Sequence, residues 1–159
     1  MNSIDWRQVQ VVVEYGPGLG AITAAILTRT EGKDFFAIEL NEAYADRFRS
    51  SFPQVPLYRD SVANLPAIAG QHGVEAIDCV ISGLPWAIFS DAVQDELLDA
   101  TFEVLRERGQ FATFVYMHGL ALPAGRRFRK KLMRRFRKVD RSPVVWRNTP
   151  PAVVYHAVR

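Results

Sequence analysis

Hydrophobic residues along the chain form short continuous runs, and most runs are followed by a segment in which apolar positions recur every three or four residues. The strand-like runs are residues 9–15, 34–40, 55–60, 76–83 and 109–117. Uninterrupted apolar runs of this length are typical of strands that are buried on both faces. The alternation of such strands with helices predicts an α/β fold with a mostly parallel sheet and helices on both of its faces.

Helical periodicity predicts the segments that cover this sheet. One helix is expected over residues 19–30, a second after the N-cap residue Asn41, and a third from the N-cap residue Ser90 to a stop at Gly109. The C-terminal part departs from this alternation of strands and helices. A basic helix over residues 126–138 is followed by two β-like runs, listed by position as 141–148 and 152–158. Strands with no helix between them pair antiparallel, so a C-terminal hairpin should complete a seven-strand sheet at its edge.

Composition bounds the class of protein. With 159 residues and 48% hydrophobic positions, the chain is long enough to bury one core, so we expect a single domain over residues 1–159. The only cysteine, Cys79, lies in an apolar run and is expected to be a packed strand residue, which favours a reducing cytoplasmic location. No apolar run approaches a membrane span of about 18 to 20 residues, so contact with a membrane would be peripheral.

Charge is distributed unevenly. Residues 1–125 hold 8 basic and 16 acidic groups, net −8, whereas residues 126–159 hold 12 basic groups and 1 acidic group, net +11. The C-terminal fifth of the chain therefore suits an anionic partner.

Three glycines follow the first strand at alternate positions, Gly16, Gly18 and Gly20. In an open α/β sheet ligands bind beyond the carboxyl ends of the strands, and glycines there let a ligand approach the backbone. The spacing differs from the dinucleotide pattern G-x-G-x-x-G. Glu39, at the end of the second strand, lies where an acid can bind a ribose diol. The alternative is a turn that only packs a helix on a strand.

The segments "EYGPGLG", "AIELN" and "RDS", in this order, resemble motifs of the class I S-adenosylmethionine (SAM) methyltransferases. The resemblance implies a Rossmann-like class I methyltransferase fold with SAM as cofactor and S-adenosylhomocysteine (SAH) as product. It implies that Glu14 lies near the methionine amino group, Glu39 on the ribose hydroxyls, and Asp60 with Ser61 against the adenine. The implied cofactor-binding residues are Glu14, Tyr15, Gly16, Gly18, Gly20, Glu39, Leu40, Asp60, Ser61 and Ser82.

The loop "SGLPWAIF" after the fourth strand is similar to the acceptor loop of amino-group methyltransferases. Loop carbonyls can aim an amine lone pair, and an aromatic face such as Trp86 favours the cation that develops. The alternative is that Pro85 shapes a turn and Trp86 fills the core. Ser82-Gly83-Leu84 departs from the Asn-Pro-Pro pattern found among these enzymes, which argues against nucleic-acid amines. The candidate catalytic residues are Ser82, Trp86, Tyr116 and His118, with a packed or surface role as the alternative for His118.

"SGLP", "FVYMHG" and the ending "RNTPPAVVYHAVR" resemble the bacterial phospholipid N-methyltransferases. The resemblance implies methylation of phosphatidylethanolamine towards phosphatidylcholine at the inner face of the cytoplasmic membrane. Members of that family carry a helical segment before the first strand. This chain begins about ten residues before that strand, so we expect the segment to be missing.

The basic helix is a candidate membrane-binding element. Its nine basic residues are Arg126, Arg127, Arg129, Lys130, Lys131, Arg134, Arg135, Arg137 and Lys138. Phe128, Leu132, Phe136 and Val139 form a narrow apolar stripe, so the helix could lie on an anionic bilayer. One alternative is that the stripe faces the core. RNA is the other, and the lack of a base-stacking aromatic pair makes nucleic acid the less favoured partner.

Other functions stay open at this point. The chain could methylate rRNA or a small-molecule amine, or it could be a non-catalytic domain that binds SAM or lipid. The three histidines and one cysteine show no metal-ligand spacing.

Overall fold

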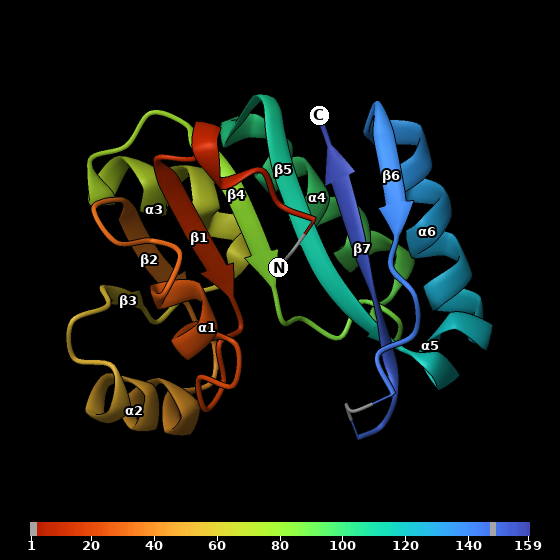
Figure 1. The fold of residues 1–159 in the computed structure, drawn as a ribbon, viewed down its shortest axis with the longest axis horizontal. Helices are drawn as coiled ribbons and strands as arrows, with labels where there is room; N and C mark the ends of the chain where they lie inside the picture. Colours follow the sequence, from red (N-terminus) through yellow and green to blue (C-terminus); the bar gives the residue numbers. More distant parts are fainter. Residues whose placement is uncertain (1–2, 147–148) are drawn as a thin grey trace.

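A computed structural model describes residues 3–146 and 149–159, in which helices cover both faces of one sheet (Figure 1). The strands run in the order β3-β2-β1-β4-β5-β7-β6. Their bounds are β1 Val11–Tyr15, β2 Asp34–Ile38, β3 Leu57–Tyr58, β4 Ile77–Ser82, β5 Leu105–Tyr116, β6 Lys138–Arg141 and β7 Ala152–Val158. Strands β1 to β5 pair in parallel, and β7 is antiparallel to both of its neighbours. The predicted mostly parallel sheet with an antiparallel C-terminal hairpin is confirmed.

The helices bury their apolar sides against two faces of this sheet. Their bounds are α1 Thr23–Leu27, α2 Glu42–Ser51, α3 Leu65–His72, α4 Asp91–Val104, α5 Met117–Ala121 and α6 Pro123–Arg135, with short 3-10 turns η1 Trp6–Gln8 and η2 Val62–Asn64. Alternate residues of β1 point to opposite faces: Val13 and Tyr15 join the cluster with α3, α4 and α6, and Val12 joins the cluster with α1 and α2. Cys79 is fully buried in the second cluster, and burial raises the pKa of its thiol to about 12, as expected of a packed strand residue.

Two predicted helix boundaries are wrong. The first helix was expected from residue 19 but begins at Thr23, because Gly16, Gly18 and Gly20 all have positive φ and the chain is still turning. The helix α4 ends at Val104, five residues before Gly109. Gly109 lies inside β5, where an added Cβ would stand 2.6 Å from the Arg106 carbonyl oxygen. That glycine allows a close backbone approach in the strand and does not end the helix.

The basic helix and the edge strand after it begin earlier than predicted, whereas β7 spans the predicted residues 152–158. The basic helix spans Pro123–Arg135, so Arg137 lies after the helix and Lys138 is the first residue of β6. The strand expected over residues 141–148 is instead Lys138–Arg141, and further along Val145 forms an isolated bridge to Ala152. Arg147 and Asn148, also within the expected strand, lie outside the described residues. No helix in the described ranges combines the length and apolar character needed to span a membrane.

Candidate active site

The glycine turn and the end of β2 are held together at the rim where β1, β2 and β4 end, the lower edge in Figure 1. The Gly16 amide donates to the Ile38 carbonyl at 2.8 Å, and the Gly18 amide donates to Glu39 Oε2 at 3.0 Å. Glu39 Oε1 accepts from the Asn41 amide at 2.9 Å. The buried Glu39 carboxylate therefore fixes the glycine turn to the segment that begins α2.

A cavity of about 270 Å³ opens beside this turn. It brings together five of the predicted cofactor-binding residues, Gly16, Glu39, Leu40, Asp60 and Ser61. The remaining wall is mainly apolar and comes from η2, the loop after β4 and the start of α4. An acid at one end and an apolar wall at the other suit a ribose carrying a flat base. An added Cβ at Gly18 would meet no atom within 4 Å, so open space lies in front of the turn.

The adenine-contacting pair is arranged differently from the expectation. The Ser61 amide donates to Asp60 Oδ1 at 2.6 Å, and Asn64 Nδ2 donates to the same oxygen at 2.8 Å. The Ser61 hydroxyl caps η2 by accepting from the Ala63 amide. The Ser61 amide is thus engaged within the protein, while Asp60 and Ser61 both line the cavity and the Ser61 hydroxyl keeps its own proton to donate.

Tyr15 is a correction to the predicted cofactor set. Its side chain is fully buried and its hydroxyl lies 3.1 Å from Thr101 Oγ1 on α4. Its carbonyl accepts from the Gly83 amide at 2.7 Å. The side chain points away from the glycine turn because alternate strand residues face opposite sides, so Tyr15 supports the core and its ring does not face the cofactor cavity.

Glu14 is buried under the glycine turn. Its carboxyl is 1% exposed and Oε2 accepts from Thr23 Oγ1 on α1 at 2.7 Å. Burial raises the pKa of Glu14 to about 7, and the Thr23 hydrogen bond opposes this shift only in part. The carboxyl therefore changes charge close to neutral pH, where its negative form would favour a cationic amino group.

This pKa predicts a measurable pH dependence. Because the folded-state pKa lies above the unfolded value of 4.5, the group stabilises the fold below that value and the contribution is lost as pH rises towards 7. Urea unfolding should show wild type losing about 2 to 3 kcal/mol relative to Glu14→Gln between pH 5 and pH 8. Parallel stability curves for the two proteins would contradict the assignment.

The acceptor loop lies directly on the glycine turn. An added Cβ on Gly83 would stand 2.7 Å from the Gly16 carbonyl oxygen, and an added Cβ on Gly16 would stand 2.8 Å from Leu84 Cδ2. Gly83 has no room for a side chain because its neighbour is backbone, and Gly16, whose neighbour is a movable Leu side chain, is restricted by its positive φ of +59°. The cofactor turn and the predicted acceptor loop thus form one continuous surface, which sequence spacing alone does not reveal.

Ser82 and Trp86 hold the loop in shape. Trp86 Nε1 donates to Ser82 Oγ at 2.9 Å, and the Ser82 carbonyl accepts from Thr113 Oγ1 at 3.0 Å. Trp86 is 1% exposed and its ring stacks on Phe128 of α6, with centroids 4.6 Å apart and an interplanar angle of 14°. These contacts favour the core-packing alternative for Trp86 over an open aromatic face for the amine.

A second cavity, of about 300 Å³, lies on the far side of this loop. Tyr116 and His118 both line it, as the sequence predicted for residues following β5, and their rings stack with centroids 5.6 Å apart. His118 is exposed and Tyr116 is half-buried. The rest of the wall is apolar and comes from the acceptor loop, the end of β5, and α5 with the residue after it.

Gln94 of α4 was missed by the sequence analysis. It is fully buried, and its Nε2 donates to the Trp86 carbonyl at 2.7 Å and to the Ala124 carbonyl at 3.0 Å. Gln94 therefore fastens the acceptor loop to the start of α6. An amide near the start of an amphipathic helix carries no sequence signal for this role.

Three of the predicted membrane-binding residues are held by contacts within the protein. Arg127, Lys131 and Arg135 form ion pairs with the α4 acids Asp91, Asp95 and Asp99. Lys131 lowers the pKa of Asp95, with Arg135 acting in the same direction. The apolar stripe of α6 is core: Phe128 and Leu132 are fully buried. The stripe was a candidate to insert into a bilayer, and the structure corrects this, because α4 and the sheet already cover it.

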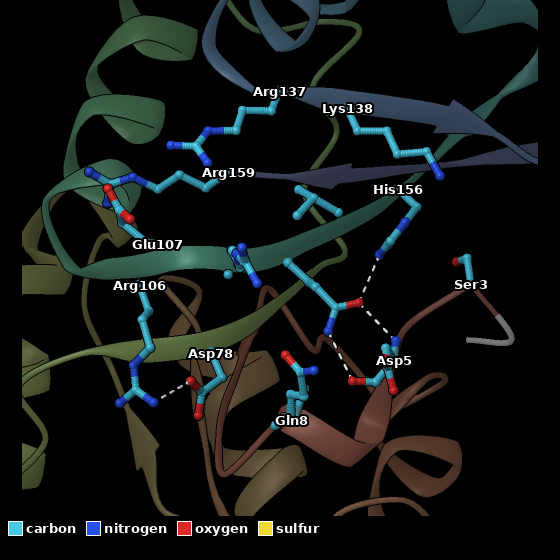
Figure 2. Close-up of a pocket in the computed structure, with 15 residues that line it drawn as sticks. Ser3, Asp5, Gln8, Asp78, Arg106, Glu107, Arg137, Lys138, His156 and Arg159 are labelled. Carbon is cyan, nitrogen blue, oxygen red and sulfur yellow. Dashed lines mark hydrogen bonds and ion pairs between the residues drawn. The ribbon is translucent and has the colours of Figure 1, made fainter.

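Another cavity, of about 540 Å³, lies at the opposite end of the sheet, where β4 and β5 begin (Figure 2). Several polar and charged side chains that line this cavity have partners within the protein. Arg106 pairs with Asp78 at 2.8 Å, Gln110 bonds to Asp5 and His156, and the Arg159 guanidinium donates to backbone carbonyls. This network joins the first residues described to the end of β7 and lies apart from the predicted site. Within the described residues, no three potential metal ligands gather.

Comparison with known proteins also indicates a methyltransferase. No protein-family model matches the chain. An ornithine lipid N-methyltransferase from Singulisphaera acidiphila is 32% identical over 98% of this chain and 79% of its own length. A glycopeptide N-methyltransferase complexed with SAH is 15% identical, with a TM-score of 0.72 over 93% of this chain and 82% of its own. The SAM-dependent O-methyltransferase of Thermotoga maritima is 17% identical, with a TM-score of 0.70 over 99% and 62%.

The solved structures are below 25% identity, so they show the fold, while the curated relative shows the family. With a Rossmann-like fold, a cavity beside its glycine turn, and 32% identity to this ornithine lipid N-methyltransferase over 98% of the chain, the protein belongs with that enzyme in one family of class I SAM-dependent methyltransferases.

Proposed function

We propose that the protein transfers a methyl group from SAM to the terminal amine of a membrane lipid. One observation carries the choice of a lipid: large apolar side chains are exposed at the acceptor cavity. Ile88 and Leu122 both line it and are 71% and 38% exposed, and Met117, beside Tyr116, is 38% exposed. An exposed apolar rim around an apolar cavity suits an acceptor whose tails remain in a bilayer.

Each step of the proposed transfer can be given to particular residues. Gly18, Glu39 and Asp60 would hold SAM, whose bound sulfonium supplies the methyl group. The acceptor loop lies between this cofactor site and the acceptor cavity, and its carbonyls would orient the amine lone pair for in-line attack. The amine nitrogen would bond to the methyl carbon as that carbon leaves the sulfonium sulfur, with SAH as the other product. His118 Nε2 or Nδ1, exposed at the cavity, would take up the proton that the amine releases.

Two aminolipids are candidate acceptors. The sequence resemblance implied phosphatidylethanolamine, whereas the curated relative is named for ornithine lipid. Both present a primary amine close to an anionic group. The membrane partner proposed here is therefore the inner, anionic face of the cytoplasmic membrane, with the protein bound peripherally.

The test is a mass-spectrometric assay with mixed vesicles that contain both aminolipids, SAM and the purified protein. The proposal expects methylated amine on one or both lipids, and their ratio identifies the preferred acceptor. Heat-treated protein and a reaction lacking SAM are the controls. SAM turnover with a small-molecule amine but with neither lipid would contradict a lipid acceptor.

Replacing Ile88 with Asn should impair use of vesicle lipid without unfolding the protein, because the side chain is exposed in the free protein. Losing the burial of an Ile in lipid, worth about 1.5 to 3 kcal/mol, should raise the KM for vesicle lipid about tenfold or more. Tyr44→Asn on α2 removes another large exposed side chain away from the cavity, at 45% exposure, and serves as the control. Equal effects of the two substitutions would disconnect the rim from lipid binding.

A further inference from the structure

The helix α6 presents three distinct faces. Arg127, Lys131 and Arg135, spaced four residues apart, face the equally spaced acids of α4. Phe128 and Leu132 lie one position further along and fill the core. The third face carries Arg126, Arg129, Lys130 and Met133, at the spacing i, i+3, i+4 and i+7.

This third face forms one wall of a hollow of about 340 Å³, which we call the α6–β6 groove. Arg126, Arg129, Lys130 and Met133 line it from α6, Arg141 from β6 and Tyr155 from β7. Arg141 and Tyr155 are register partners in the two-strand hairpin, so β-pairing fixes their positions. The groove is therefore built from three elements of regular structure, with the buried Tyr155 ring at its base.

The four cations of the groove have no acidic counterpart. No carboxylate lines the groove, and across the described residues Arg126, Arg129, Lys130 and Arg141 form no ion pair. Burial raises the pKa of Tyr155, while the charges of Arg129 and Arg141 act in the opposite direction, so their positive potential reaches this ring. Like charges brought together in this way destabilise the fold unless an anion joins them.

The cavity in Figure 2 offers the contrast. Five cations line that cavity, and the acids Asp5, Asp78 and Glu107 line it too. The Arg106 guanidinium points at Asp78 (Figure 2). Arg106 there pairs with an acid and Arg159 donates to backbone carbonyls, so these two cations have partners within the protein. No acid of the described chain lines the α6–β6 groove, so the negative charge that offsets its cations has to come from a ligand.

The groove and the acceptor cavity lie on either side of α5. Gly119 and Leu122 line the acceptor cavity, and Leu120, between them, lines the groove. Met133 is 58% exposed at the groove, and Leu122 is 38% exposed at the cavity. A surface that reaches one opening can therefore reach the other.

We propose that the α6–β6 groove binds the head-group phosphate of an anionic phospholipid, separately from the lipid that is methylated. Guanidinium groups bind phosphate oxygens in paired hydrogen bonds, and three arginines and one lysine here surround one hollow. The exposed Met133 would contact the apolar part of the same lipid. Binding at the groove would hold the acceptor cavity against the bilayer, and this role rests on the proposed function.

The test compares two double variants that lose the same charge. Arg129→Gln with Arg141→Gln removes one cation of the groove from α6 and one from β6, so two of its four cations are lost. Arg134→Gln with Arg137→Gln removes two exposed cations that form no ion pair in the described chain and do not line the groove. Sedimentation with vesicles of phosphatidylglycerol and phosphatidylcholine measures membrane binding, and thermal melting with inorganic phosphate against chloride at equal ionic strength measures anion binding.

A phosphate site predicts that the groove variant binds these vesicles at least tenfold more weakly than the matched control variant. Phosphate should raise the melting temperature of wild type and of the control variant but not of the groove variant. Without phosphate the groove variant should melt at or above wild type, since repulsion between cations is relieved. Equal vesicle binding by the two variants would overturn the proposal, whether or not phosphate alone stabilises wild type. Neither readout requires methyl transfer, so failure of the proposed activity would be recognised separately.

Discussion

Replacing Gly18 with Val should abolish SAM binding while leaving the protein folded. Gly18 has φ of +56° and no protein atom within 4 Å of an added Cβ, so the new side chain would occupy the open space in front of the turn. A non-glycine residue in this conformation costs about 1 to 3 kcal/mol, which a domain with typical stability tolerates. We expect SAM affinity measured by calorimetry to fall at least about 100-fold, or about 3 kcal/mol.

Gly20→Ala is the informative comparison. Its added Cβ would stand 2.0 Å from Phe52 Cε2, and Phe52 packs on Phe48 in the core of the second face. We expect this smaller substitution to lower the melting temperature more than Gly18→Val does. If Gly18→Val instead bound SAM with wild-type affinity, the open space at the turn would not be the cofactor site.

Replacing Trp86 with Ala should cause the largest loss of stability among these variants. The indole is buried against Phe128, Phe111 and Phe89, and truncating a buried Trp costs about 3 to 5 kcal/mol. The loss should appear as a lower denaturation midpoint in urea with an unchanged slope.

Trp86→Phe separates packing from chemistry. A phenyl ring keeps the stack on Phe128 but removes the donor to Ser82 Oγ, so we expect a loss of about 1 to 2 kcal/mol. Phe128→Ala should resemble Trp86→Ala, because it removes the other half of the stack. A Trp86→Ala protein with wild-type stability but no methyl transfer would restore the substrate-facing role that the sequence suggested.

The sheet was predictable because its strands are nearly continuous apolar runs. The charged edge strand β6 was not: Lys138 and Arg141 are exposed, and edge strands carry such charges to prevent further pairing. The apolar "VVW" that follows predicts a strand a few residues further along instead. Helix α3 was missed although Pro66 at its start and Gly73, with φ of +88°, at its end are ordinary boundary signals.

The candidate site was predictable to the level of backbone position. Glycine spacing and an acid after β2 identified Gly18 and Glu39, which the structure joins by a hydrogen bond. The direction of a side chain was harder to predict. Tyr15 and Trp86 lie beside the site in sequence, but each points into the core, because neighbouring helices offer them apolar partners.

The role of the charged residues of α6 was likewise only partly predictable from the sequence. Nine basic residues in one segment indicated an anionic partner, but three of them are matched by acids of α4 at the same four-residue spacing. Sequence gives the number of cations. Only the packing of α6 against α4 shows which of them remain available to a ligand.

Transfer of radiolabelled methyl from SAM to vesicles containing phosphatidylethanolamine and ornithine lipid, with RNA in a parallel reaction, tests the central claim most directly. The account predicts label in the lipid fraction and loss of that label with Gly18→Val. Label in RNA, or no label in either fraction despite calorimetric SAM binding, would contradict a lipid amine methyltransferase.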